Sequence, residues 1–481
     1  MKSLRKTVLM LTLAIVLLAW AGVAHSAQVK VPAAEAKVPA FKITEKSIAD
    51  TTGLSVAERS EEISPDARHV AFAIQKDGKK AVVLDGVVGK WYEGVSFLYF
   101  SPNSKRLAHY ATKDSGEKWA VVVDGVEGKF YDGPPYRAFS PDSKRFAYTA
   151  RLGNKEVAVI DGVESKACDE IKAADLTFSP NSKHIAYALR QGDKWRVVLD
   201  GVEKTQYDDV RNLEFSPDSR HLSYAAKRGD KWVAEIDGKA GPEYDDVGIR
   251  QMIAVTFSPN SRRTLYVAKR GGKSLMVIDG VETKEYEYIG RGNFSPDSKH
   301  VVYLIPKGKK EALMVDGVEG KEYDGISSIS FSPDSKHITY HASRGGKIVM
   351  VLDGVEGKEY DDIYDSAIFS PNSKRIEYAA MSNTPKGRSI VVDGVEGKWY
   401  DHAGWFSFSP DSKHFAHWAQ RGDKWIAVVD GVEAKEFDGI IFSFNTKFVF
   451  DSPTRLHWLA LSGGKVMLVE VQIKMAKPAE K

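Results

Sequence analysis

The sequence predicts an all-β protein, a β-propeller array of about eleven four-stranded repeats that form one large ring or two rings. Two recurring dipeptides and a recurring alternation of apolar residues carry this prediction. Ser-Pro recurs at steps of 37 to 43 residues, and Asp-Gly follows it by 21 residues in eight units and by 23 in two. Such a fixed period indicates a repeat architecture. The Ser-Pro dipeptides start at Ser64, Ser101, Ser140, Ser179, Ser216, Ser258, Ser295, Ser332, Ser370, Ser409 and Ser452.

The unit at residues 176–208 shows how one repeat divides into four strands, a to d. Strand a runs to Phe178 and ends at the Ser-Pro turn, because proline cannot donate to a sheet ladder. Strand b alternates through Tyr187 and is apolar on both sides, which is typical of a strand covered on both faces. Strand c contains Trp195, and an Asp-Gly hairpin leads into strand d, which passes through Tyr207.

Four-stranded units of this length, apolar on both sides, pack face to face around an axis, as the blades of a propeller do. A linear β-solenoid is the alternative, but solenoid coils are usually shorter and lack the Asp-Gly hairpin. The number of rings is left open. Ser64, Ser258 and Ser452 are separated by 194 residues each, which predicts either two rings with a seam near residues 240–256 or one ring with two loop insertions. We expect a strand from residues 41–60 to complete the last unit.

The N-terminus has the pattern of a secretory signal peptide over residues 1–26. Three bases, Lys2, Arg5 and Lys6, precede an uncharged apolar run over residues 8–24. An uncleaved anchor helix is the alternative. Residues 27–45 are expected to be a flexible tether, residues 46–474 the repeat region and residues 475–481 a tail. The prediction is a periplasmic or secreted protein with no membrane insertion after cleavage.

The charge balance gives no reason to expect nucleic acid as a partner. The chain has 68 Lys and Arg against 65 Asp and Glu, and three of the bases lie in the predicted signal peptide. The remainder is formally neutral, whereas binding to a phosphate backbone relies on an excess of basic residues. Cys168 is the only cysteine, so no intramolecular disulfide can form.

The segment FSPNSKHIAY at residues 178–187 resembles the WD40-like propeller repeats of TolB-type proteins, and the resemblance extends over roughly residues 60–470. It implies a β-propeller. In that family the turn usually reads Ser-Pro-Asp-Gly, whereas this chain has Ser in place of the Gly, as at Ser143. It also has a DGVEGKEYD hairpin, at residues 316–324 and 353–361. These departures indicate a distinct subfamily, and a role like that of TolB in the Tol–Pal system is not inferred.

The up-and-down order of the strands assigns the turns to two faces. The a–b (Ser-Pro) and c–d (Asp-Gly) turns share one face, and the b–c turns and d–a connections share the other. The second face varies from unit to unit, and binding residues concentrate in variable loops on a rigid scaffold. Aromatic residues and Arg are the usual anchors of interfaces. The alternative is that they fill gaps between blades. The predicted partner-binding residues are Tyr136, Arg137, Arg211, Arg250, Tyr288, Arg291, Tyr364, His402 and Trp405.

No catalytic residue, metal site or cofactor is predicted. Cys168 occupies the position that Tyr or Phe fills in other units, so it is assigned to packing. The acid that follows this position, such as Asp132 or Asp169, could form a cation-binding ring but is better explained as a turn cap. No Gly-x-Ser-x-Gly motif occurs, and no α/β region follows the repeats to carry a peptidase triad.

The predicted function is a non-enzymatic, exported scaffold that binds envelope or extracellular protein partners through the variable face. One alternative is a carbohydrate or cell-wall binding module that uses Trp91, Trp399 and Trp405, and it loses its main support if Trp91 and Trp399 are buried between blades. The other is a propeller-channel enzyme, for which His402 is the sole candidate residue.

Overall fold

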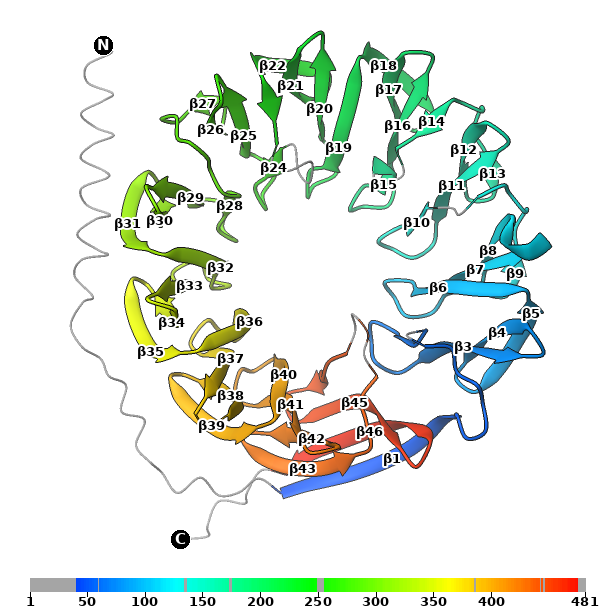
Figure 1. Cartoon of the computed structure of the whole chain (residues 1–481), viewed down its shortest axis with the longest axis vertical. Coiled ribbons are helices and arrows are strands. Elements are labelled where there is room, and N and C mark those ends of the chain that lie inside the picture. The colour runs from blue at the N-terminus through cyan, green and yellow to red at the C-terminus, as the bar shows by residue number, and fades with distance from the viewer. Residues whose placement is uncertain are drawn as a thin grey trace. The chain divides into compact units, whose positions relative to one another are not determined.

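The computed structural model describes residues 40–474, apart from residues 59, 134–135, 173–174, 249–254, 385, 442 and 444–445 and the side chains of Arg137, Asp365 and Lys386. The predicted signal peptide, residues 27–39 and the tail lie outside the described residues. Residues 41–474 form one compact unit, in which eleven four-stranded blades make a single ring (Figure 1). Strand a of each blade lies toward the centre of the ring and strand d on its outer rim.

The first four blades are ordered a to d and all their strand pairs are antiparallel. Blade 1 contains β2 (Glu62–Ile63), β3 (Val70–Lys76), β4 (Lys79–Leu84) and β5 (Val87–Tyr92). Blade 2 contains β6 (Gly94–Phe100), β7 (Leu107–Lys113), β8 (Lys118–Val123) and β9 (Val126–Glu127). Blade 3 contains β10 (Tyr136–Phe139), β11 (Phe146–Leu152), β12 (Lys155–Ile160) and β13 (Val163–Glu164). Blade 4 contains a split strand a, β14 (Glu170–Ile171) and β15 (Thr177–Phe178), with β16 (Ile185–Gln191), β17 (Lys194–Leu199) and β18 (Val202–Tyr207).

Blades 5 to 8 follow the same order. Blade 5 contains β19 (Asp209–Phe215), β20 (Leu222–Arg228), β21 (Lys231–Ile236) and β22 (Lys239–Tyr244). Blade 6 contains a split strand a, β23 (Asp246–Val247) and β24 (Thr256–Phe257), with β25 (Thr264–Arg270), β26 (Lys273–Ile278) and β27 (Val281–Glu282). Blade 7 contains β28 (Asn293–Phe294), β29 (Val301–Lys307), β30 (Lys310–Val315) and β31 (Val318–Tyr323). Blade 8 contains β32 (Gly325–Phe331), β33 (Ile338–Arg344), β34 (Lys347–Leu352) and β35 (Val355–Tyr360).

The last three blades complete the ring. Blade 9 contains β36 (Asp362–Phe369), β37 (Ile376–Asn383), β38 (Lys386–Val392) and β39 (Val395–Tyr400). Blade 10 contains β40 (His402–Phe408), β41 (Phe415–Arg421), β42 (Lys424–Val429) and β43 (Val432–Phe437). Blade 11 contains β44 (Val449–Ser452), β45 (Arg455–Ser462), β46 (Lys465–Lys474) and, as strand d, β1 (Ala40–Asp50). Asp114–Gly116 form a 3-10 turn, and no helix among the described residues is long and apolar enough to span a membrane.

The ring closes as expected, by a strand from the N-terminal side of the repeats that completes the last blade. β1 pairs with β46, so the first and last parts of the described chain share one sheet. β1 begins at Ala40, so residues 40–45 belong to the propeller, and the tether boundary drawn at residue 45 is corrected. Arg68 reinforces the closure from blade 1, because its guanidinium bonds Asp451 (3.0 Å) and Glu470 (3.3 Å) of blade 11. The buried His457 of blade 11 contacts the Asp66 carbonyl oxygen at 2.7 Å.

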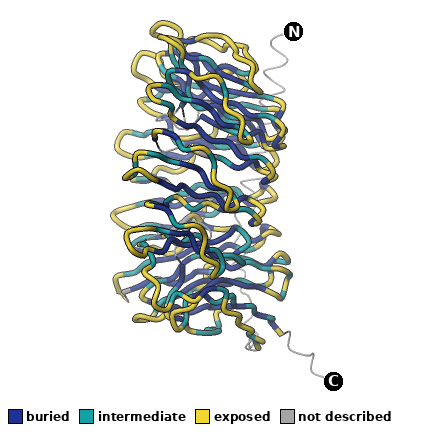
Figure 2. The backbone as a smooth tube through the Cα atoms, turned by 90° about the vertical axis from the view of Figure 1, so that its right-hand side faces the viewer, coloured by how far each residue is buried: buried dark blue, intermediate teal, exposed yellow. Residues whose placement is uncertain are grey.

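The question of one ring or two is settled by the arrangement of the blades, which follow one another around a single ring that the pairing of β1 with β46 closes (Figure 1). In the region near residues 240–256, strand a of blade 6 is split into β23 and β24. Residues 249–254 themselves lie outside the described residues. The core consists of layers between neighbouring blades rather than one central cluster. For example, Trp195 and Val197 of blade 4 pack with Leu222 and Tyr224 of blade 5. Buried strands lie between turns that are exposed at both faces of the ring (Figure 2).

The serine two residues after the proline of the Ser-Pro turn joins its blade to the one before it. Its φ lies between +60° and +66°, a region that glycine would occupy more easily. Its hydroxyl nevertheless accepts a hydrogen bond from a backbone N–H of the preceding turn, such as that of Asp142 to Ser182 Oγ (2.9 Å). Nine such bonds of 2.9–3.0 Å occur among the described residues, and they lead to Ser104, Ser143, Ser182, Ser219, Ser261, Ser298, Ser335, Ser373 and Ser412.

The DGVEGKEYD hairpin also joins neighbouring blades, along the outer rim. Glu356 of β35 accepts bonds from Lys321 Nζ (2.5 Å) and from the hydroxyl of the buried Tyr323 (2.9 Å), both on β31 of the preceding blade. The same arrangement joins Lys358 and Tyr360 to Glu396. The charged side chains also occupy an exposed edge strand, where they disfavour pairing with another chain. The motif therefore serves the ring itself.

Candidate functional site

The two faces of the ring differ as the strand order predicts. On the Ser-Pro and Asp-Gly face, the Asp of each Asp-Gly turn bonds the His or Arg that follows the Ser-Pro turn, as in His184–Asp200 (2.7 Å) and Arg145–Asp161 (2.9 Å). Ten such pairs of 2.6–2.9 Å are present in the described part of the chain. These side chains hold the turns together, which leaves the opposite face as the place to look for a site.

Four of the predicted partner-binding residues are exposed on the variable face. The side chains of Tyr136, Tyr288 and Tyr364 are 47%, 43% and 41% exposed, and Arg291 is exposed too. The Tyr288 hydroxyl donates to Glu311 at 2.6 Å, and burial together with that carboxylate raises the pKa of Tyr288 to about 12. The side chain of Arg137 and the whole of Arg250 lie outside the described residues.

Arg211 is occupied inside the ring instead. Its guanidinium carbon lies 3.9 Å from the ring centre of Trp232, and its Nη2 bonds Asp246 and the Val247 carbonyl oxygen (2.9 Å) of the next blade. Only 16% of its side chain is exposed. Lys172 does the same one blade earlier, where it lies over Trp195 and bonds Asp209. The contacts of Arg211 therefore agree with the alternative interpretation, in which the residue fills a gap between blades.

Tyr364, His402 and Trp405 come together between blades 9 and 10, beside Arg388, which is not among the predicted partner-binding residues. Arg388 on β38 lies with its guanidinium carbon 3.6 Å from the Tyr364 ring centre. Its Nη1 donates to His402 Nε2 at 2.6 Å. Because a guanidinium can only donate, this nitrogen of His402 must be the unprotonated acceptor, and the imidazole is neutral. We call Tyr364, Arg388, His402 and Trp405 the blade 9–10 cluster.

Trp405 gives this cluster its apolar side. Its ring stacks on His402 at 5.3 Å, with 21° between the planes, and meets the buried Trp425 edge-on at 5.8 Å. Trp405 has φ +51°, at a bulge where β40 shifts register against β41. A bulky residue is strained in this left-handed region, and such strain is found where the surrounding structure over-determines it, often at functional sites. The same bulge carries Asn212 and Ser328 in blades 5 and 8.

Arg388 pairs across the sheet with the d-strand Tyr400, and the matching strand-c position differs from blade to blade. Blades 4, 5 and 10 carry Trp195, Trp232 and Trp425 there, whereas blades 1, 7 and 8 carry Lys80, Glu311 and Ile348. Because the position varies in this way, a comparison of units gives no signal that singles out Arg388.

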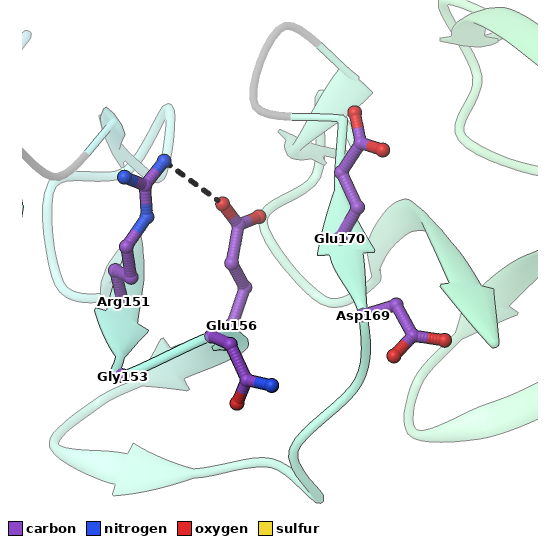
Figure 3. A pocket seen from close by; sticks show the side chains of 6 residues that line it. Arg151, Gly153, Glu156, Asp169 and Glu170 are labelled. Carbon is purple, nitrogen blue, oxygen red and sulfur yellow. Dashed lines mark ion pairs between the residues drawn. The ribbon is translucent and has the colours of Figure 1, made fainter. Parts of the chain in front are cut away.

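A separate depression between blades 3 and 4 is lined by Arg151, Gly153, Asn154, Glu156, Asp169 and Glu170 (Figure 3). Its acidic groups already have partners. Glu156 accepts the Ile171 N–H at 2.7 Å and lies 3.7 Å from Arg151, and Glu170 bonds Arg190. We therefore assign these groups to the joint between the blades.

The acids that follow the d strands cap b–c turns, as one of the two sequence interpretations proposed. Asp169 accepts the Gly192 N–H at 2.6 Å, and Asp132 accepts that of Gly153 at the same distance. Hydrogen bonds from Lys155 and from the Gly192 N–H lower the pKa of Asp169, and those from the Gly153 N–H and Lys118 lower the pKa of Asp132. Within the described ranges, no group of three or more His, Cys, Asp or Glu could hold a metal ion. Burial raises the pKa of the Cys168 thiol to about 11, as expected for a packing residue.

The tryptophans named for carbohydrate stacking are partly buried. Trp91 packs against the core between blades 11 and 1, and Trp399 against the core between blades 8 and 9. Trp405 is engaged with His402 and Trp425. All nine tryptophans in the described part of the chain are buried or partly buried. The carbohydrate alternative therefore loses its main support.

Comparison with known proteins returned fold neighbours alone. No family model and no curated protein matches the chain. TolB from Acinetobacter baumannii is 13% identical over 58% of this chain and 78% of its own, with a TM-score of 0.24. The β-propeller domain of the Trilobed protease from Pyrococcus furiosus is 12% identical over 53% and 92%, with a TM-score of 0.27. Dihydro-heme d1 dehydrogenase NirN is 15% identical over 66% and 77%, with a TM-score of 0.32. At these scores the similarity carries no argument about activity, and the propeller assignment rests on the strand pairing.

Proposed function

We propose that the protein is a non-enzymatic, exported scaffold that binds protein partners of the cell envelope through the variable face of its propeller. The observation that carries the proposal is the difference between the two faces. On the Ser-Pro face, the recurring polar side chains bond one another and the turns. On the variable face, Tyr136 in β10, Tyr364 in β36 and Tyr288 in the connection before β28 depart from the repeat and are exposed. Tyrosine offers a large amphipathic contact surface, and exposed aromatic residues of this kind are typical interface anchors.

Export is supported by the signal-peptide pattern of residues 1–26. A non-enzymatic role is supported by the occupation of the titratable groups on the variable face. Asp132 and Asp169 cap turns, Glu170 bonds Arg190, and Tyr288 bonds Glu311. His402 accepts a hydrogen bond from Arg388 and is not poised as a general base.

Crosslinking in living cells followed by affinity capture tests the proposal, with the exported protein carrying a C-terminal tag. One bait has Tyr136, Tyr288 and Tyr364 changed to Ala. The matched control has Val126 and Val163 changed to Ser, because these side chains are exposed at the start of β9 and β13, beside the Asp-Gly turns. We expect the native and control baits to capture the same proteins and the tyrosine variant to lose them. Capture by the tyrosine variant equal to the native bait would remove the variable face as the binding surface.

A further inference from the structure

The blade 9–10 cluster differs from its counterparts in blades 4 and 5 by the loss of a negative charge. In each of those blades a cation lies over a Trp of its own blade and bonds a carboxylate of the next blade, Asp209 for Lys172 and Asp246 for Arg211. Each of these carboxylates stands two residues after the aromatic residue that ends the preceding strand d, Tyr207 or Tyr244. His402 holds that position after Tyr400. The cation is kept and its carboxylate is replaced by a neutral imidazole.

In blade 9 the cation and the aromatic ring of the stacked pair occupy each other's positions in the repeat. Arg211 lies four residues after Tyr207 and Trp232 on strand c, whereas Tyr364 lies four residues after Tyr360 and the cation, Arg388, is on strand c. Stacking on Tyr364 fixes the plane of the guanidinium. This arrangement keeps the cation next to an exposed aromatic ring rather than next to a buried one.

The charge of Arg388 is not neutralised by the residues that the structure describes. Its hydrogen bond to His402 uses one of five N–H donors, and it forms no ion pair within the described residues. Of the acidic residues close to His402 and Tyr364 in the chain, Asp401 accepts the Gly422 N–H (2.7 Å) and Asp362 accepts the Ile363 N–H (2.8 Å), and the side chain of Asp365 lies outside the described residues. Arg388 is also partly exposed. A planar guanidinium with free parallel donors matches a carboxylate in a bidentate fashion.

We propose that Arg388, oriented by Tyr364 and His402 and bordered by Trp405, binds a carboxylate of the protein partner. The inference rests on the proposed function and deepens it. One guanidinium balances the single charge of a carboxylate, whereas a phosphate group is usually met by several cations or backbone N–H groups. The bordering aromatic rings favour a partner segment with an aromatic or apolar side chain beside its carboxylate, either at its C-terminus or at an Asp or Glu side chain.

Peptide binding to the purified mature protein tests the inference without the natural partner. The probes are three acetylated tetrapeptides: Ala-Ala-Ala-Phe with a free carboxyl end, the same peptide as its amide, and the Ala-Glu-Ala-Phe amide. Calorimetry and tryptophan fluorescence report binding. We expect at least one carboxylate peptide to bind at least ten-fold more tightly than the uncharged amide. The free-acid and Glu peptides distinguish a terminal carboxylate from a side-chain carboxylate.

Two variants connect this preference to Arg388. Arg388→Gln should abolish the ten-fold preference, and so should His402→Asp, which restores the carboxylate found in blades 4 and 5 and so supplies the guanidinium with an internal partner. Arg344→Gln is the control, because Arg344 is an exposed base of blade 8 already bound to Glu356 and Glu359. Thermal unfolding of each variant shows whether it folds.

Three outcomes overturn the inference: equal binding of charged and uncharged peptides, an unchanged preference in Arg388→Gln, or tighter binding of inorganic phosphate than of either carboxylate peptide. A failure here with successful capture in cells leaves the scaffold function standing and rejects this site. Carboxylate binding with no partner captured in cells rejects the scaffold function and leaves the site.

Discussion

Replacing Ser182 with alanine removes one bond between blades 3 and 4 without changing the shape of the turn. The Ser182 hydroxyl is 5% exposed and accepts the Asp142 N–H at 2.9 Å. The net contribution of such a bond is about 1 kcal/mol. Alanine and serine are equally strained at the φ of +63°. We therefore expect Ser182→Ala to cost about 1 kcal/mol of stability, which is roughly a five-fold change in the opening equilibrium.

Glycine at the same position separates the hydrogen bond from the backbone strain. Ser182→Gly also loses the bond but relieves about 1 kcal/mol of left-handed strain. Its greater freedom in the unfolded chain takes back part of that gain. The expected order of stability is therefore Ser, then Gly, then Ala. If the bonds act independently, changing Ser143, Ser182 and Ser219 together to Ala costs about 3 kcal/mol.

Hydrogen exchange measured by mass spectrometry is the suitable assay, because a ring of many blades is not guaranteed to unfold in two states. The Asp142 amide should exchange about five times faster in Ser182→Ala. Lys183→Ala, an exposed change in the same turn, is the control and should stay within about 0.5 kcal/mol of the native protein. Exchange at the native rate in Ser182→Ala would refute the assignment of the serine as a link between blades.

Three further predictions concern buried charge and ring closure. Burial raises the pKa of Glu377 well above its usual value, so the folded state holds a proton that the unfolded chain releases above pH 4.5. Stability should therefore fall as pH rises from 4.5, by up to about 1.4 kcal/mol per pH unit, and Glu377→Gln should remove this slope in urea titrations at pH 5 and pH 8. In acid the sign is opposite. Burial raises the pKa of Asp297, but hydrogen bonds from Ser295 and Lys299 outweigh it and lower the value to about 2, while burial lowers the pKa of His417 to about 3. In the Glu377→Gln variant, which removes the opposing slope, stability should decline below pH 6.5 as His417 resists protonation and further between pH 4 and pH 2 as Asp297 is protonated, and melting temperatures of this variant that stay constant over this range would contradict both assignments. Arg68→Met should weaken ring closure by about 1 to 3 kcal/mol because it removes the partner of carboxylates in blade 11, and limited proteolysis should then cut first near β1.

The blade 9–10 cluster shows how far unit-by-unit comparison reaches for the site. Tyr364, His402 and Trp405 were selected because they break the repeat, and the structure brings these three together. Arg211, selected on the same grounds, is bonded to Asp246 inside the ring. The sequence pattern is the same in both cases. Which contacts a departing residue makes depends on its neighbours across the blade interface, and these lie about 35 residues away in the chain.

The repeat alone determined the content of each blade. The strands expected in residues 176–208 are observed as β15 to β18, and the strand needed to complete the last blade is observed as β1. These features depend on local alternation, on proline and on Asp-Gly turns, all of which act within about ten residues. The tertiary structure decided what the repeat could not: that all eleven blades close into one ring, that the turn serine bonds the preceding blade, and that Arg388 forms no ion pair with a carboxylate among the residues described. Each of these depends on how neighbouring blades are rotated and spaced, because identical local patterns are compatible with rings of different size.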